Sequence, residues 1–95
     1  MKLFQLLNSD NDFGGLYKVD DSNPLTNDEI ADAIKNAFDE ADKNYKDGDD
    51  ITEKAEEILK IKGIVRVFVE EVVYKNLWKC FSQKNKVRFE NKRND

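Results

Sequence analysis

The sequence predicts a small α+β domain in which two helices pack on one face of a mainly antiparallel sheet. Three observations predict this fold class. They are two short apolar runs near the N-terminus, a β-branched run over 64–74, and two segments of helical periodicity that lie between the N-terminal runs and residue 64. The expected order is β-β-α-α-β, with one or two further strands near the C-terminus. Ninety-five residues are enough for one core. We expect 1–82 to form this domain and 83–95 to form a basic C-terminal tail or an edge strand.

The run over 64–74 is the strongest strand signal in the chain. Val65, Val67 and Val69 alternate with charged or aromatic residues, which is typical of a strand with one buried face. We therefore expect it to be the central strand of the sheet. Glu70 and Glu71 interrupt the alternation, and we expect a wide β-bulge or a turn at this point, which would redirect Val72 and Tyr74.

Four shorter segments complete the predicted sheet. Apolar residues over 3–7 and 13–19 predict two strands, and the polar stretch 8–12 between them suits a hairpin loop. Near the C-terminus, 77–81 and 86–89 predict two antiparallel strands joined through 83–85. The alternative for this last part is a frayed C-terminal tail, or a tail that becomes ordered when a partner binds.

The first helix has a complete start signal. Thr26 and Glu29 match a capping box, and Leu25 and Ile30 occupy the positions of a hydrophobic staple. Spacing at 100° per residue places seven residues on one apolar stripe: Ile30, Ala33, Ile34, Ala37, Phe38, Ala41 and Tyr45. This helix should therefore bury one face and leave the other in water.

The second helix is predicted to start after Asp50, with Glu53 as the capping partner. Its inner stripe consists of Ile51, Ala55, Ile58 and Leu59. Gly63 suits the left-handed residue that ends a helix, and Ile64 just beyond it can pack on Leu59. The chain should therefore pass directly from this helix into the valine-rich strand.

Composition excludes several kinds of site. The chain has no histidine and a single cysteine, Cys80, which rules out histidine-dependent catalytic triads, histidine-containing zinc sites and an internal disulfide. A reducing compartment, the cytoplasm, is the expected location, and no run approaches the ~18 apolar residues of a membrane span. We expect no catalytic residues, no cofactor, no bound metal and no membrane partner.

The loop between the two helices has one alternative function to weigh. Residues 42–53 have the length of an EF-hand calcium loop, with Asp42, Asn44 and Glu53 at ligand positions. Lys46, however, stands where an oxygen ligand is needed, and Gly48 is one position late. Weak calcium binding is therefore an alternative, and a solvated acidic loop is the simpler interpretation.

Charge is distributed unevenly along the chain. The net charge is −4, but residues 1–74 contain 18 acids and 9 bases, whereas residues 75–95 contain 7 bases and 2 acids. Such asymmetry indicates a charged partner, although ordinary solubility would explain it too. We expect a non-enzymatic protein that binds another protein with a basic surface.

The acidic side chains predict the first version of this function. Six of them would cover a basic, nucleic-acid-handling surface, as small nuclease inhibitors and phage proteins that block bacterial defence do as a class. An Asn- and Lys-rich chain is compatible with a phage or bacterial source. The six residues are Asp28, Asp32, Asp39, Asp47, Asp49 and Asp50.

The basic C-terminal segment predicts the alternative. Bases interleaved with aromatic rings are typical of proteins that bind single-stranded nucleic acid, because the rings stack on bases and the cations pair with phosphates. The candidate residues are Trp78, Phe81, Lys84, Lys86, Arg88, Lys92 and Arg93. The two versions differ in which charged set forms a continuous exposed surface.

Overall fold

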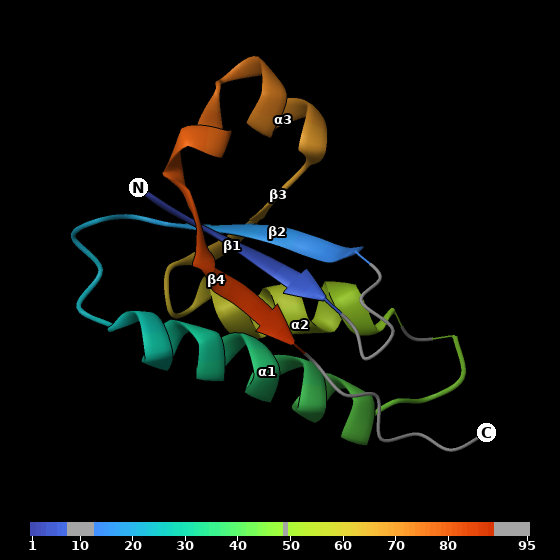
Figure 1. The fold of residues 1–95 in the computed structure, drawn as a ribbon. Helices are drawn as coiled ribbons and strands as arrows, with labels where there is room; N and C mark the ends of the chain where they lie inside the picture. The colour runs from blue at the N-terminus through green and yellow to red at the C-terminus, as the bar shows by residue number, and fades with distance from the viewer. Residues whose placement is uncertain (8–12, 49, 89–95) are drawn as a thin grey trace.

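The computed structural model describes residues 1–7, 13–48 and 50–88. These residues form a mixed sheet of strand order β3-β2-β1-β4, with two helices below it and a short helical segment above it (Figure 1). The elements in chain order are β1 (Lys2–Leu7), β2 (Phe13–Val19), α1 (Asn27–Lys43), α2 (Ile51–Lys60), β3 (Ile64–Val67), α3 (Val69–Tyr74), the 3₁₀ helix η1 (Leu77–Cys80) and β4 (Phe81–Arg88). The prediction of a small α+β domain is confirmed.

The two N-terminal strands form as predicted. β1 pairs with β2 in antiparallel register, so that Phe4 lies opposite Tyr17, and β2 pairs with β3 in the same sense. The predicted hairpin loop over 8–12 lies outside the described residues. This antiparallel half of the sheet confirms the predicted β-β-α-α-β order as far as β3.

The start of α1 confirms the predicted capping box. The Thr26 hydroxyl accepts a hydrogen bond from the Glu29 backbone N–H at 3.2 Å, and the Glu29 carboxylate accepts one from the Thr26 N–H at 3.0 Å. The hydrogen bond from the Thr26 backbone N–H to the carboxylate lowers the pKa of Glu29, and both bonds satisfy donors that a helix start leaves unpaired. The apolar stripe is buried over Ile30, Ala33, Ile34, Ala37, Phe38 and Ala41.

α2 also begins and ends much as the sequence predicts. Asp50 accepts a hydrogen bond from the Glu53 N–H at 3.1 Å. After the helix, Gly63 adopts φ +76°, in the left-handed region that favours glycine. The turn brings Ile64 into the same buried cluster as Leu59, which is the contact that the sequence predicted.

Most of the core lies between the helices and one face of the sheet. Side chains from alternate strand positions, such as Phe4 on β1 and Val19 on β2, pack against the stripes of α1 and α2. The two helices therefore cover one face of the sheet, as predicted (Figure 1).

A second, smaller cluster lies on the opposite face of the sheet. Leu3, Leu16 and Val67 point away from the two long helices and are covered by Val72 of α3 and Leu77 of η1. Neither this cluster nor a third helix follows from the sequence interpretation, which left that face uncovered. The domain is therefore a sheet with helical cover on both sides.

The prediction of a central valine strand over 64–74 is wrong. β3 ends at Val67 and lies at the edge of the sheet. Where a bulge or a turn was expected, Glu70 and Glu71 form the first turn of the helix α3. A helical turn directs Val72 into the second cluster while Glu70 stays in water. The tertiary contact of Val72 thus overrides the strand preference of the valines.

The C-terminal strands and the mainly antiparallel character of the sheet also need correction. The predicted strand over 77–81 is a 3₁₀ helix up to Cys80, and the predicted turn over 83–85 lies within a single strand, β4. β4 pairs with β1 in parallel, so the sheet is mixed. Asn85 is buried there, and its amide donates a hydrogen bond to the Leu3 carbonyl at 3.3 Å, while its Oδ1 has no partner among the described residues.

Candidate functional site

The acidic residues predicted on α1 lie together on its outer face. At 100° per residue, Asp28, Asp32 and Asp39 fall within 40° of one another, opposite the buried stripe. Asp28 and Asp32 are exposed, and Asp39 is partly exposed. Asp47 and Asp50 are exposed between α1 and α2, whereas Asp49 lies outside the described residues. The fold therefore brings three of the six predicted acids onto one helix face.

The helical layer as a whole carries a large negative excess. Residues 27–60 contain 12 acids and 5 lysines, giving a net charge of −7 in a chain whose total is −4. We call the outward side of α1, α2 and their connection the acidic helix face. Its lysines are Lys35, Lys43, Lys46, Lys54 and Lys60. The rest of the chain has 11 bases and 8 acids, a net charge of +3.

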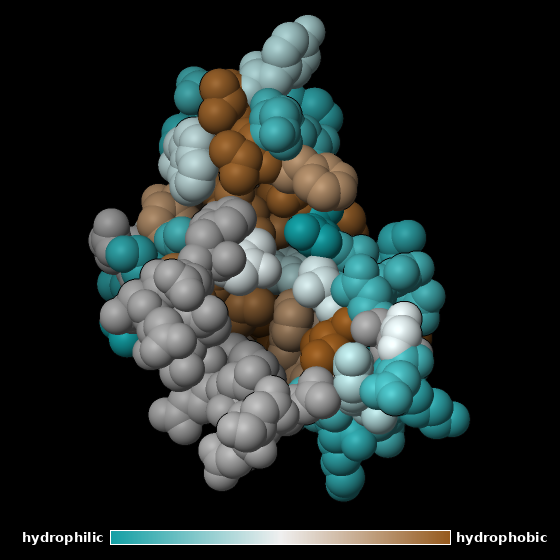
Figure 2. All heavy atoms as spheres, turned by 90° about the vertical axis from the view of Figure 1, so that its right-hand side faces the viewer, coloured by the Kyte–Doolittle hydropathy of each residue, from teal (hydrophilic) through white to brown (hydrophobic). Residues whose placement is uncertain are grey.

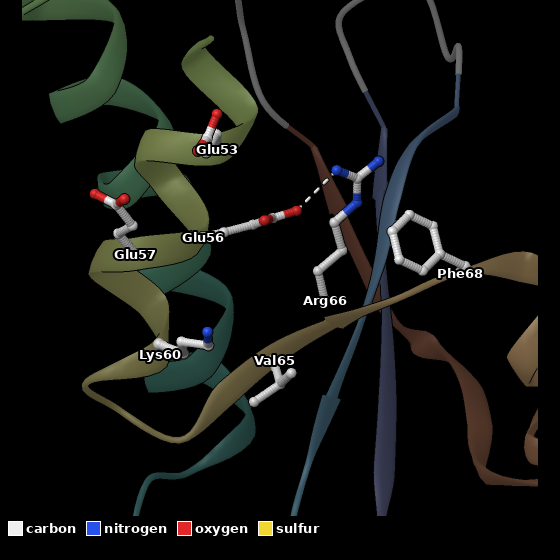
Figure 3. Close-up of a pocket in the computed structure, with 7 residues that line it drawn as sticks. All are labelled: Glu53, Glu56, Glu57, Lys60, Val65, Arg66 and Phe68. Carbon is white, nitrogen blue, oxygen red and sulfur yellow. Dashed lines mark hydrogen bonds and ion pairs between the residues drawn. The ribbon is translucent and has the colours of Figure 1, made fainter.

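A cleft of about 320 Å³ lies between α2 and the edge strand β3. Three carboxylates line its α2 side, and Arg66 points from β3 across it toward α2 (Figure 3). The Arg66 guanidinium pairs with Glu56 at 2.7 Å and lies 5.3 Å from the centre of the Phe68 ring. The lining residues are Glu53, Glu56, Glu57, Lys60, Val65, Arg66 and Phe68.

The two other carboxylates of the cleft differ from Glu56. Within residues 1–7, 13–48 and 50–88, neither Glu53 nor Glu57 takes part in an ion pair. They lie one helical turn apart on α2 and are exposed. They can therefore receive a cationic group from a partner, and they extend the acidic helix face toward the edge of the sheet.

Tyr17 lies beneath this region and is fully buried. It faces Arg66 across the β2–β3 pair, and its hydroxyl has no hydrogen-bond partner among the described residues. Burial raises its pKa to about 12, with the nearby Glu56 carboxylate adding to the shift and the Arg66 guanidinium opposing it. The side chain is therefore neutral near pH 7 and is poorly suited to exchange protons there.

The basic residues of β4 share the other face of the sheet. Lys84, Lys86 and Arg88 are exposed, and they alternate with the buried residues Asn85 and Val87. Residues 77–88 carry four bases and no acid. The described part of the alternative set is thus brought together, whereas Lys92 and Arg93 lie outside the described residues.

The predicted aromatic residues are only partly available for stacking on bases. Trp78 and Phe81 contact each other edge to face, with ring centres 6.1 Å apart. Trp78 is exposed, but Phe81 is partly buried against the second cluster. One ring is therefore used mainly in packing, which weakens the nucleic-acid version of the site.

Glu71 holds α3 onto the sheet. Its carboxylate pairs with Lys75 one turn along α3 at 2.9 Å and with Lys18 of β2 at 3.8 Å. The hydrogen bond from Lys75 is the main reason why the pKa of Glu71 is lowered, and Lys18 lowers it further. Glu71 therefore stays ionised and acts as a tether for α3.

Sequence reasoning missed two groups of surface residues. The first is the set of glutamates on α2, of which the sequence singled out only Glu53, as a capping partner and as a ligand position of the calcium-like loop. The second is a group of exposed apolar and aromatic side chains on and beside α3. At the top of Figure 2, where α3 lies, brown hydrophobic residues reach the surface among teal hydrophilic ones. The i, i+4 spacing of Val69 and Val73 is the signal that could have indicated it. Its members are Phe68, Val69, Val73, Tyr74 and Trp78.

Metal and membrane sites can be assessed for the described residues. No three acidic or cysteine side chains among them group closely enough to hold a metal ion, although the calcium-loop interpretation includes Asp49, which is not among them. In the same part of the chain, every helix is too short or too polar to cross a membrane.

Comparison with family models, curated proteins and solved structures finds no match to this chain.

Proposed function

We propose that this protein binds another protein and catalyses no reaction, and that its acidic helix face covers a basic, nucleic-acid-handling surface of that partner. The observation that carries the proposal is the net charge of −7 over residues 27–60, of which −5 belongs to the two helices, whose inner sides are fixed in the core. A rigid helical layer presents this charge without a large ordering cost on binding.

The arrangement of the acids supports a surface contact rather than a ligand pocket. Asp28, Asp32 and Asp39 follow the length of α1, and Glu53 and Glu57 continue the negative surface along α2 toward β3. Complementary charge of this kind raises the association rate and discriminates against acidic partners, and salt screens it over about 8–10 Å. Binding should therefore weaken as salt is added.

The proposal is tested by capture from an extract of the source cells with immobilised protein. The wild type should retain a nucleic-acid-handling protein that salt elutes, and the double variant Asp32→Asn/Asp39→Asn should lose it. Both positions lie beyond the first turn of α1, so the cap at Thr26 is left intact.

A matched control changes the same number of charges on the other side of the molecule. The double variant Lys84→Gln/Lys86→Gln alters two exposed residues of β4 and should capture the partner as the wild type does. Equal capture by the Asp32/Asp39 variant, or loss of capture by the Lys84/Lys86 variant, would contradict the proposal.

Nucleic-acid binding by β4 is the second candidate, favoured by the shared exposed side of Lys84, Lys86 and Arg88. The negative helical layer opposes it, because it repels a phosphate backbone at close range. A gel shift with single-stranded oligonucleotides separates the two functions. A shift that fades with salt and is lost in Lys84→Gln/Lys86→Gln would favour this candidate over the first.

A further inference from the structure

We propose that two copies of this chain pair through α3 and η1, forming a two-fold dimer. This inference goes beyond the proposed function and does not depend on it. The interface would be the α3 patch, which we define as Phe68, Val69, Val73, Tyr74 and Trp78.

Exposure is the first observation behind the α3 patch. All five members are large apolar or aromatic residues, yet their side chains are exposed to solvent. The exposed fractions are 63% for Phe68, 43% for Val69, 63% for Val73, 90% for Tyr74 and 41% for Trp78. They lie within eleven consecutive positions, whereas the other exposed large apolar residues of the described chain, Met1 and Ile61, belong to other elements. Single exposed apolar residues are ordinary, but a cluster of this kind marks an interaction surface.

The core beneath the α3 patch fixes its geometry. Val72 and Leu77 are buried in the second cluster and hold α3 and η1 on the sheet, and Glu71 ties α3 to Lys18. Val73, the residue after the inward-pointing Val72, is 63% exposed, and Val69, one turn before Val73, is 43% exposed. The patch is therefore an organised surface.

The exposed area of the α3 patch can be compared with the area that a small dimer buries. With aromatic side chains burying about 150–250 Å² each, the exposed fractions of Phe68, Tyr74 and Trp78 make about 300–500 Å² available per copy. Complete burial of these surfaces, including the part of Phe68 that lines the cleft beside Arg66, brings two copies with the two valines to about 1,000 Å², the lower limit for a specific interface.

The charges around the patch favour a second copy over an oppositely charged partner. Glu70 and Lys79 are exposed beside the patch and take part in no ion pair within the described residues, and Glu71 and Lys75 pair with each other. With Lys18, which pairs with Glu71, and the Arg66–Glu56 pair beside Phe68, the rim carries three acids and four bases, so both signs are present in nearly equal number. A two-fold contact is self-complementary, since each copy offers the other both an acid and a base.

The position of the patch also keeps the acidic helix faces of the two copies apart. α3 covers the face of the sheet opposite α1 and α2 (Figure 1). Two copies that meet through α3 therefore direct their acidic helix faces outward, away from each other. If the proposed function holds, the dimer presents two such faces and gains avidity for a partner with two basic sites.

Analytical ultracentrifugation of the full chain from low to several hundred micromolar tests the proposal. The mass should rise from the 11.1 kDa of one chain toward twice that value with increasing concentration. A mass that stays at one chain over the whole range overturns the proposal, and the patch would then be left for a different partner.

Variants locate the contact. Val73→Lys places a cation in the centre of the patch, and at the end of α3 it suits the helix dipole, so the fold should persist. Dimer affinity should fall at least about tenfold, as at a central interface residue. Tyr74→Ser, at a position 90% exposed, should weaken the dimer without any added charge. Circular dichroism checks that both variants stay folded.

Ile61→Lys is the matched control, because Ile61 is 89% exposed and lies outside the patch, at the end of α2. It should dimerise like the wild type. Undiminished dimerisation of the folded Val73→Lys and Tyr74→Ser variants, or loss of the dimer in Ile61→Lys alone, would place the contact elsewhere and overturn the proposal.

Discussion

The buried hydroxyl of Tyr17 is a local conflict within an otherwise apolar core. It has no hydrogen-bond partner among the described residues, and burying such a group costs about 1–3 kcal/mol. Tyr17→Phe keeps the ring and its edge contact with Phe38, so we expect the free energy of unfolding to rise by roughly 1 kcal/mol. Urea denaturation measures this change. A lower stability of the variant would mean that the hydroxyl makes a favourable contact.

The same hydroxyl should make stability depend on alkaline pH. The pKa of Tyr17 is raised from 10.0 to about 12 in the folded state, so the folded protein binds its proton more tightly than the unfolded chain does. The contribution of the neutral Tyr17 hydroxyl to the free energy of unfolding is fully present below pH 10 and is lost as pH rises toward 12. Wild type should therefore lose on the order of 2 kcal/mol relative to Tyr17→Phe over that range. The free energy of unfolding of both proteins is measured against pH, and the difference between them removes the contribution of lysines that titrate in the same range. Equal slopes for the two proteins would contradict the expectation.

Gly63 is required by both its backbone conformation and its surroundings. It adopts φ +76°, and a Cβ there would lie 2.9 Å from Nδ2 of Asn23, which donates to the Lys62 carbonyl. Gly63→Ala should cost roughly 2 kcal/mol or more, since the left-handed conformation alone costs about 1–2. Gly48→Ala is the control, because Gly48 has φ +88° but nothing within 4 Å of the added carbon. Thermal denaturation should rank Gly63→Ala as the less stable, and equal losses would show that the Asn23 contact does not matter.

At the scale of elements, α3 depends on one valine. Val72 is fully buried in the second cluster, whereas its neighbour Val73 is 63% exposed. Val72→Ala should lower the free energy of unfolding by roughly 1–3 kcal/mol. Val73→Ala makes the same chemical change and should alter monomer stability by less than about 0.5 kcal/mol. Equal effects in dilute urea titrations would mean that α3 does not pack as described.

The elements that the sequence predicted well are those whose signals are local. Thr26 with Glu29, and Asp50 with Glu53, determine where α1 and α2 begin from contacts three residues apart. β4 follows a different rule, because its parallel pairing with β1 joins segments about 80 residues apart. The helical state of α3 depends in the same way on Val72 meeting Leu3, Leu16 and Val67. No pattern within 64–81 encodes those partners.

At the scale of the whole molecule, the sequence indicated the charge division but not its arrangement. The acids of α1 follow from helical periodicity, so their common face was predictable from 3.6-residue spacing. The cleft was not, because it requires Glu56 of α2 to meet Arg66 of an edge strand that the sequence placed in the centre. The α3 patch was missed for the same reason, since a strand would have buried half of its residues.

The two faces of the sheet should also differ in how readily they open. Among the described residues, fourteen are buried in the cluster beneath α1 and α2, and five in the cluster beneath α3. The free energy of a local opening increases with the number of buried contacts that the opening breaks. We therefore expect the α3 amides to exchange through openings that cost less than global unfolding, and those inside α1 to exchange only with it.

Native-state hydrogen exchange at low denaturant measures this difference. The amides of Val72 and Lys75, which donate to the Phe68 and Glu71 carbonyls, should be less protected than that of Ile34 in the buried stripe of α1. If α3 forms the dimer interface, the protection of its amides should also increase with protein concentration, because only chains with α3 closed can dimerise. The protection of α1 in a monomeric Val73→Lys variant is the reference against which this increase is measured. Equal protection of α3 and α1 at every denaturant concentration would mean that the two clusters unfold as one unit. α3 would then be as firmly held as the main core, although only five buried residues support it.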